Sequence, residues 1–174
     1  MQAKRDISVS VKEMQPEDLE TAAEVHRLAF TRQQHSLEWL RSHLQAFPKI
    51  FCYVAYAEES CVGYIIWSQK AGFRSNAIIE LEQVAVSPGF QGKGIGRALI
   101  SRTLPDVTIK LQKQGSVLQH ILVTTRADNH AQRLYKEVLG AEVEATLTNL
   151  YSADEVIMVA RDVNTYHLSA SPGS

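Results

Sequence analysis

The stretch VSPGFQGKGIGRAL, residues 86–99, lies between an apolar run and a run of helical composition, and it contains four glycines. Glycine has no Cβ atom, so successive main-chain N–H groups around it can turn toward one ligand. The positive end of the dipole of the following helix adds to their attraction for an anion. The stretch therefore predicts a phosphate-binding loop between a strand and a helix.

Two common phosphate-binding loops do not fit this spacing. A Walker loop needs Ser or Thr directly after Gly-Lys, and here Gly94 follows Gly92 and Lys93. A dinucleotide fingerprint needs G-x-G-x-x-G, whereas this chain has G-x-G-x-G. The sequence thus argues against both a P-loop nucleotide hydrolase and a nicotinamide-dependent dehydrogenase.

Hydrophobic periodicity predicts strands and helices on both sides of the loop. Pro105 is expected to end or kink the helix that follows the loop, because proline lacks a main-chain donor and clashes with the preceding turn. Together the segments predict a mixed α/β sheet. The strands are expected over 7–14, 50–57, 61–69, 77–86, 120–127, 141–150 and 154–163, and the helices over 16–30, 36–47, 97–104, 106–115 and 128–140.

Length and composition favour one globular domain. The chain has 174 residues, of which 45% are hydrophobic, and we expect a core over 7–163 and a disordered polar tail over 164–174. The 18 basic and 19 acidic residues nearly cancel and form no basic stripe, so we expect no nucleic-acid partner. The sequence shows neither a membrane-spanning stretch nor a signal peptide, and we therefore expect a cytoplasmic protein with no membrane partner.

The metal-binding residue types do not form a recognisable site. Cys52 and Cys61 are too few for a disulfide framework or a four-ligand zinc site. They could face each other across a hairpin, but we expect two buried free thiols. The histidines at 43, 120 and 130 have no partners at metal-ligand spacing. No metal is therefore expected.

Several motifs together resemble the Gcn5-related N-acetyltransferase (GNAT) superfamily. QGKGIG matches Q/R-x-x-G-x-G/A, LEQVAVSPGFQGKGIG is similar to the central strand and loop of that family, and VTTRADNHAQRLYKEVLGAEV resembles its second CoA-binding segment. The order of elements agrees over roughly residues 7–163. The resemblance implies a mixed, mostly antiparallel sheet of six to seven strands flanked by helices, with a splayed central strand pair. It also implies acetyl-CoA as co-substrate, with its pyrophosphate on the loop.

The resemblance assigns roles to named residues. Glu80 and Glu82 lie two apart and so share one face of a strand. The resemblance places the general base at one of them; the alternative is an ion-paired or solvated carboxylate. It makes Tyr135 the general acid, where the alternative is a core tyrosine, and it directs the Val84 N–H at the oxyanion. The acetyl-CoA contacts it implies are Val84, Ala85, Val86, Gln91, Gly92, Lys93, Gly94, Ile95, Gly96, Arg97 and either Asp128 or Asn129.

The implied reaction is acetyl transfer to a primary amine by direct attack in a ternary complex. LTNLYSADEVIMVAR resembles the tail of ribosomal-protein N-terminal acetyltransferases, which makes Tyr151 a candidate substrate contact. The acceptor stays open between a protein N-terminus or lysine and a small-molecule amine, and a homodimer stays open as well. The alternative function is a non-catalytic acyl-CoA-binding or regulatory module, which Glu80, Glu82 and Tyr135 argue against. Two departures from the family pattern are about five extra residues around Pro105 and a longer spacing from Tyr135 to Gly140.

Overall fold

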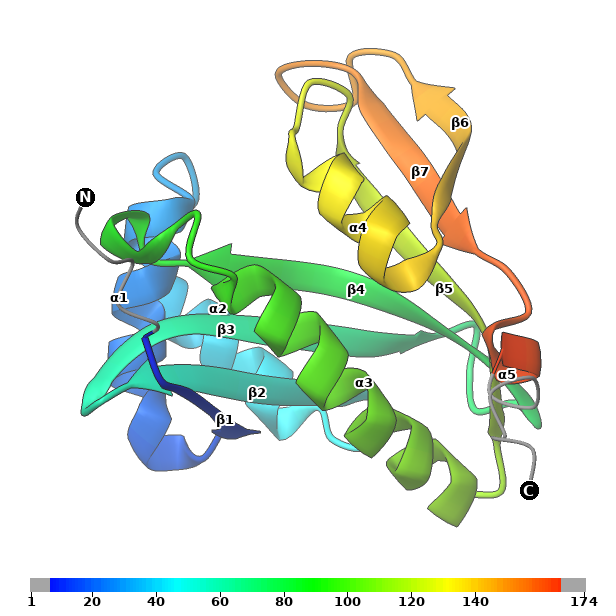
Figure 1. Cartoon of the computed structure of the whole chain (residues 1–174), viewed down its shortest axis with the longest axis horizontal. Helices are drawn as coiled ribbons and strands as arrows, with labels where there is room; N and C mark the ends of the chain where they lie inside the picture. The colour runs from blue at the N-terminus through cyan, green and yellow to red at the C-terminus, as the bar shows by residue number, and fades with distance from the viewer. Residues whose placement is uncertain (1–6, 167–174) are drawn as a thin grey trace, which may run out of the picture. The chain divides into compact units, whose positions relative to one another are not determined.

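The computed structural model describes residues 7–166, in which seven strands form one mixed sheet flanked by helices (Figure 1). This confirms the predicted fold class. The strands are β1 (Val9–Glu13), β2 (Ile50–Ala57), β3 (Ser60–Lys70), β4 (Asn76–Val86), β5 (Val117–Arg126), β6 (Glu142–Leu147) and β7 (Glu155–Ala160). The helices are α1 (Leu19–Ala29), α2 (Ser36–Gln45), α3 (Ile95–Lys113), α4 (Ala131–Leu139) and α5 (Val163–Tyr166), with short 3-10 turns at Pro16–Asp18 and Pro88–Phe90.

The sheet has the strand order β1-β2-β3-β4-β5-β7-β6. The pairs β1–β2, β5–β7 and β6–β7 are antiparallel, and β4–β5 is parallel. The parallel ladder starts at Asn76 and Val117 and ends at Glu80 and Leu122, although β4 itself continues to Val86. The short ladder agrees with the predicted splayed central pair.

The chain divides into two compact units. The first unit comprises residues 1–66 and 83–103, and the second unit comprises residues 67–82 and 104–174. The strands β3 and β4 and the helix α3 each run from one unit into the other. Whether these units form the single domain expected from the sequence stays a prediction.

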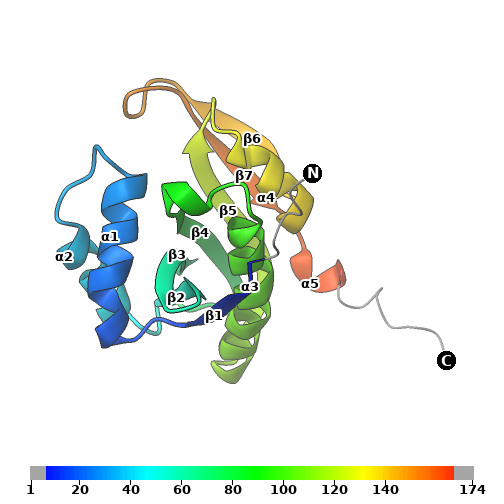
Figure 2. The ribbon, with the colours of Figure 1, turned by 60° about the vertical axis from the view of Figure 1, so that its left-hand side comes forward.

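In the first unit, α1 and α2 lie side by side and cover one face of β2 and β3 (Figure 2). The apolar residues of α1 recur at helical spacing, so they form one face that can be buried. That face packs against side chains of α2 and of both strands. The buried members of this core are Met14, Leu19, Ala22, Ala23, Val25, Leu40, Cys52, Val54, Tyr64, Ile66 and Ala85. Cys52 and Cys61 are both in the thiol form; Cys52 is buried as expected, whereas Cys61, near the β2–β3 turn, is half-buried.

A buried carboxylate connects the start of α1 to the sheet. Asp18 is 2% exposed and accepts hydrogen bonds from the Gln15 N–H at 2.8 Å and from the Tyr56 hydroxyl at 2.7 Å. Lys12 Nζ lies 3.0 Å from its Oδ1. Burial alone would raise the pKa of Asp18, but the bonds from Gln15, Tyr56 and Lys12 together lower it. Asp18 is therefore ionised at neutral pH and stabilises the fold.

Replacing Asp18 with asparagine is expected to destabilise the protein by about 2 kcal/mol at pH 7, because hydrogen bonds to a charged group are lost. The pKa of Asp18 is lower in the folded than in the unfolded protein. Its contribution to the free energy of unfolding is therefore complete at pH values above the pKa that it has in the unfolded chain. This contribution is lost as the pH falls through the pKa that Asp18 has in the folded protein. Urea unfolding at pH 7 and pH 3 measures both effects, with the exposed Glu20→Gln as control. Equal stability of Asp18→Asn and the wild-type protein at pH 7 would contradict this account.

In the second unit, α4 and α5 pack against β5 (Figure 1). Tyr135 and Leu139 are the buried residues of α4, and Gly140 ends the helix with a φ of 70°. The tail prediction is wrong for residues 164–166, which are helical in α5, while residues 167–174 lie outside the described part of the chain. Among the described residues, every helix is too short or too polar to cross a membrane.

The helix break expected at Pro105 is absent, because α3 continues through this residue to Lys113. A proline inside a helix removes one hydrogen bond and crowds the preceding turn. Here the helix has fully buried side chains on both sides of the proline, Leu99 and Ile100 before it and Val107 and Leu111 after it. Burial of this apolar face outweighs the local cost of the proline.

Candidate functional site

The glycine loop joins β4 to α3 in the first unit. Gly92 and Gly94 have φ values of 72° and 80°. Residues with a Cβ atom pay about 1–2 kcal/mol for this left-handed conformation, so glycine is needed at both positions. The Ala98 N–H donates to the Gly94 carbonyl oxygen at 3.0 Å, which ties the loop to the first turn of α3. The loop therefore has a defined conformation.

Several consecutive main-chain N–H groups of this loop have no hydrogen-bond acceptor among the described residues. They are the N–H groups of Gly92 through Gly96. These groups lie at the N-terminus of α3, a helix of 19 residues. Because unpartnered N–H groups and the helix dipole both favour negative charge, the arrangement can bind a phosphate group.

Two side chains of the loop bond back to main-chain oxygens. The Gln91 amide donates to the Val86 carbonyl at 3.2 Å and so joins the loop to the end of β4. Lys93 Nζ donates to the Gly89 carbonyl at 3.1 Å and lies 5.0 Å from the centre of the Phe90 ring. The Lys93 ammonium is thereby held on the loop, where it adds positive charge.

In the second unit, Glu80 lies in a polar cluster on the sheet. Its Oε2 is 2.8 Å from Lys70 Nζ, and its Oε1 accepts a hydrogen bond from Thr124 Oγ1 at 3.3 Å. The bond to Glu80 raises the pKa of Lys70, and the negative charges of Glu80 and Glu82 raise it further. Lys70 is thus a cation at neutral pH, and it fixes the orientation of the Glu80 carboxylate.

The burial pattern of β4 changes next to this cluster. Ala77, Ile79 and Leu81 are buried in regular alternation, whereas residues 82–84 are three consecutive half-buried residues. Ala85 is again buried at an odd-numbered position, so the interruption is confined to residues 82–84. The register irregularity between β4 and β5 lies between Ala77 and Ile78. Val84, which the resemblance expects to direct its N–H at the oxyanion, is half-buried.

Tyr135 points its ring into the core of the second unit and is 5% exposed. Burial raises the pKa of its hydroxyl to about 12, so this group is protonated at neutral pH. The hydroxyl makes no hydrogen bond to any other residue in the described part of the chain. The O–H can therefore donate to solvent or to a ligand.

The residues before α4 have different surroundings. Both oxygens of Asp128 bond to the Arg126 guanidinium at 2.9 Å. Asn129 Oδ1 accepts from the Ala131 N–H at 2.9 Å, and its Nδ2 donates to Thr125 Oγ1 at 2.8 Å. Asn129 thus joins the first residue of α4 to β5, while the N-cap position itself is His130. Tyr151, in the connection between β6 and β7, is 78% exposed.

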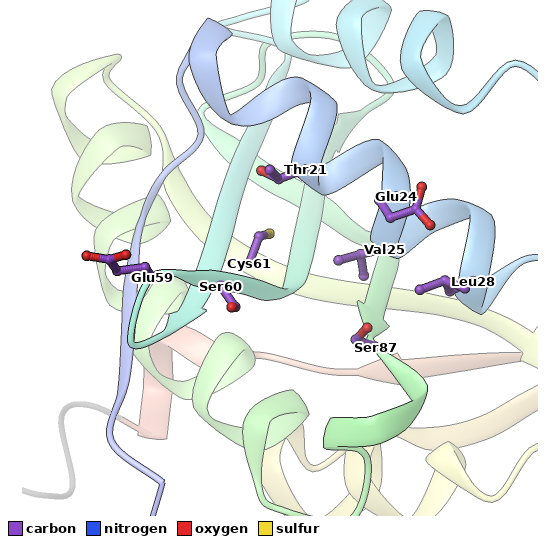
Figure 3. A pocket seen from close by; sticks show the side chains of 8 residues that line it. All are labelled: Thr21, Glu24, Val25, Leu28, Glu59, Ser60, Cys61 and Ser87. Carbon is purple, nitrogen blue, oxygen red and sulfur yellow. The ribbon is translucent and has the colours of Figure 1, made fainter.

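A separate pocket of about 310 Å³ lies in the first unit between α1 and the β2–β3 turn (Figure 3). It is lined by Thr21, Glu24, Val25, Leu28, Glu59, Ser60, Cys61 and Ser87. These residues come from three separated segments of the chain, so their common pocket could not be predicted from the sequence. The pocket contains none of the predicted catalytic residues.

The structure groups the predicted site residues by unit. The first unit holds 84–86 and the loop 91–97, and the second unit holds the remaining candidates, which are Glu80, Glu82, Asp128, Asn129, Tyr135 and Tyr151. Lys70 and Thr124 were not among the site residues predicted from the sequence. The only sequence signal for Lys70 was a charge directly after the apolar run that became β3.

Comparison with known proteins gives one family. A sequence profile described as the Acetyltransferase (GNAT) family matches residues 17–141. No curated protein sequence matches the chain.

Solved structures share the fold. The ribosomal-protein-S18-alanine N-acetyltransferase of Escherichia coli superposes with a TM-score of 0.70 at 20% identity, covering 89% of this chain and 94% of that one. Naa50 of Arabidopsis thaliana, in complex with the bisubstrate analogue CoA-Ac-MVNAL, gives 0.69 at 18% identity, covering 88% and 98%. The PaiA N-acetyltransferase of Thermoplasma acidophilum, in complex with coenzyme A, gives 0.61 at 20% identity, covering 88% and 99%. At these identities the likeness is one of fold.

Proposed function

The chain belongs to the GNAT family of acetyltransferases, and on this premise we propose that it transfers the acetyl group of acetyl-CoA to a primary amine. The observation that carries the proposal is the row of unpartnered N–H groups from Gly92 to Gly96 at the start of α3. It falls within the matched segment, and it suits the pyrophosphate of acetyl-CoA. Attack is direct, in a ternary complex without a covalent enzyme intermediate.

In this proposal, main-chain groups hold the co-substrate. The loop amides bind the pyrophosphate, while Lys93 and Arg97 add positive charge. Ala85 and Val86 bind the pantetheine through their main chain. The Val84 N–H donates to the thioester oxygen as it becomes an oxyanion, and such a preorganised donor is worth about 3 kcal/mol in the transition state.

We assign the general base to Glu80. A base must be held in place by further groups, and Lys70 and Thr124 do this for Glu80. Glu80 removes a proton from the acceptor, directly or through a water molecule, so that the neutral nitrogen attacks the carbonyl carbon. The nitrogen of the resulting tetrahedral intermediate is positively charged, and it loses a second proton to solvent before the C–S bond breaks. Glu82 contributes negative charge that attracts a cationic acceptor.

Tyr135 is the proposed general acid. When the tetrahedral intermediate collapses, the C–S bond breaks and its electron pair stays on sulfur. The Tyr135 hydroxyl donates its proton to that thiolate, and solvent returns a proton to the tyrosine. The products are free coenzyme A and an N-acetylated amine. A protonated hydroxyl without another partner in the described chain supports this role.

Calorimetry with coenzyme A and assays of thiol release from acetyl-CoA test the proposal. Suitable acceptors are the peptide Met-Val-Asn-Ala-Leu, Nα-acetyl-lysine and 1,4-diaminobutane, which represent protein N-termini, protein lysines and small amines. We expect binding of coenzyme A and turnover of at least one acceptor class. Binding without turnover would favour the non-catalytic acyl-CoA module, and absence of binding would remove both functions.

Gly94→Ala is expected to weaken binding of coenzyme A about tenfold, because alanine at a φ of 80° costs about 1–2 kcal/mol and turns the loop amides away. Gly89→Ala in the same loop is the matched control. A Cβ atom at Gly89 meets nothing within 4 Å, and no left-handed φ is needed there. Calorimetry measures both affinities. If the two variants bound coenzyme A equally well, the loop conformation would not matter for binding.

A further inference from the structure

Ser68, near the end of β3, has a buried hydroxyl group. The residue is 2% exposed, and its Oγ makes no hydrogen bond to any residue in the described part of the chain. Buried polar groups in folded proteins are nearly always hydrogen-bonded, and an exception is explained by a bound water molecule or by a role in catalysis. The surroundings of Ser68 combine both explanations.

The hydroxyl lies on the sheet face that carries the proposed base. Successive side chains of a strand point to opposite faces, so Ser68 and Lys70 share one face of β3. Lys70 Nζ is 2.8 Å from Glu80 Oε2, which places Glu80 on that face of β4. Glu82 shares the face of Glu80 because it is two residues further along the strand. All four residues belong to the second unit.

The pairing of the strands brings Ser68 next to Glu82. The strands β3 and β4 are neighbours and run antiparallel, because Val62 near the start of β3 bonds to Ser87 after the end of β4. Two residues back from Lys70 on β3 therefore correspond to two residues on from Glu80 on β4, which is Glu82. The charges of both glutamates raise the pKa of Lys70, which agrees with carboxylates on both sides of its ammonium.

Ser68 is smaller than the neighbouring side chains on its face of β3. These are Ile66, which is fully buried, and Lys70, whose side chain is 44% exposed. A short side chain between two long ones leaves room for a small polar molecule. A buried water molecule typically makes about three hydrogen bonds to polar groups without another partner. The Ser68 hydroxyl supplies one of these bonds, and the carboxylates of Glu80 and Glu82 supply further acceptors.

We propose that Ser68 is a positioning residue whose hydroxyl holds the water molecule that carries the proton from the acceptor amine to Glu80. The inference rests on the proposed acetyl transfer. The water oxygen accepts hydrogen bonds from the Ser68 hydroxyl and from the acceptor ammonium, and its two hydrogens point to Glu80 and Glu82. The ammonium gives a proton to the water as the water gives one to Glu80. The water molecule is thereby regenerated, and the amine is left neutral.

Ser68→Ala tests this inference, because it removes only the hydroxyl. We expect kcat to fall about tenfold at pH 7, while KM for acetyl-CoA stays within twofold. Loss of the bound water disfavours the ionised carboxylates, so the acidic limb of the pH profile of kcat/KM should move to higher pH. Ser68→Thr keeps the hydroxyl and should restore both properties. Ser116→Ala, at another buried serine of the second unit, is the matched control.

A crystal structure of the wild-type protein with coenzyme A gives a readout that does not depend on turnover. We expect a water molecule within hydrogen-bonding distance of Ser68 Oγ and of a carboxylate oxygen of Glu80 or Glu82, and we expect Ser68→Ala to lose it. A Ser68 hydroxyl without a bound water would overturn the inference.

Kinetics and unfolding separate the proposed role from a merely structural one. An unpaired hydroxyl destabilises the protein, so in that case Ser68→Ala would raise the urea midpoint and keep its kcat, which would overturn the inference. A lower kcat with an unchanged pH profile would also overturn it. Wild-type protein that turns over none of the three acceptors would mean instead that the proposed function itself fails, and the crystal structure would still show whether Ser68 holds a water molecule.

Discussion

Glu80→Gln is expected to lower kcat for acetyl transfer about 100-fold at pH 7, which is typical for removal of a general base. The amide keeps the shape of the side chain and can still bond to Thr124, so the loss reports the missing proton acceptor. Binding of coenzyme A should not change. Steady-state kinetics with the best acceptor of the panel, together with calorimetry, measure both effects.

The pH dependence makes this test sharper. At higher pH a growing fraction of the acceptor amine is neutral in solution, and it needs no base for its first deprotonation. The deficit of Glu80→Gln should therefore shrink as the pH approaches the pKa of the amine, near 8 for a protein N-terminus and about 10.4 for lysine. A deficit that stayed constant over this range would argue for a structural role of Glu80.

Glu82→Gln is the matched variant, because the same change is made two residues away on the same strand. We expect it to lower kcat by only a few-fold and to raise KM for a cationic acceptor. If Glu82→Gln lost activity about 100-fold and Glu80→Gln did not, the base would be Glu82, and the Lys70 ion pair would mark Glu80 as structural.

Tyr135→Phe is expected to lower kcat at least about tenfold and to leave the affinity for coenzyme A within twofold, because only the proton donor for the thiolate is removed. The phenyl ring still fills the same buried space on α4. Since the pKa of Tyr135 is about 12, its ionisation should not limit the wild-type rate below pH 10. An unchanged kcat would show that the thiolate leaves without help from Tyr135.

Tyr56→Phe is the matched control for Tyr135→Phe. Its hydroxyl donates to Asp18 in the first unit, outside the proposed chemistry. We expect this variant to lose stability and to keep its kcat. A parallel loss of kcat in both variants would point to a general effect of destabilisation, and thermal unfolding of the two proteins distinguishes the cases.

The local features of this fold could be predicted from the sequence. The conformation of Gly92 and Gly94 is a property of residues without a Cβ atom, so the loop between a strand and a helix was readable from its spacing. The apolar face of α1 and the helix that carries Tyr135 could also be predicted, because helical periodicity relates residues that are three or four positions apart. The continuation of α3 through Pro105 was not, because burial of the helix on both sides of the proline outweighed the local rule.

The sequence by itself thus determined the order of the elements, the glycine-rich loop between β4 and α3, and the candidate carboxylates. Only the tertiary structure decided which side chains surround the carboxylates: Thr124 reaches Glu80 over 44 positions of the chain, and Ser68 shares their face of the sheet. Such pairs depend on strand register, and a register shift by one residue would turn every side chain to the opposite face. Local periodicity contains no information on that register, which is why Lys70, Thr124 and Ser68 became visible only in the folded chain.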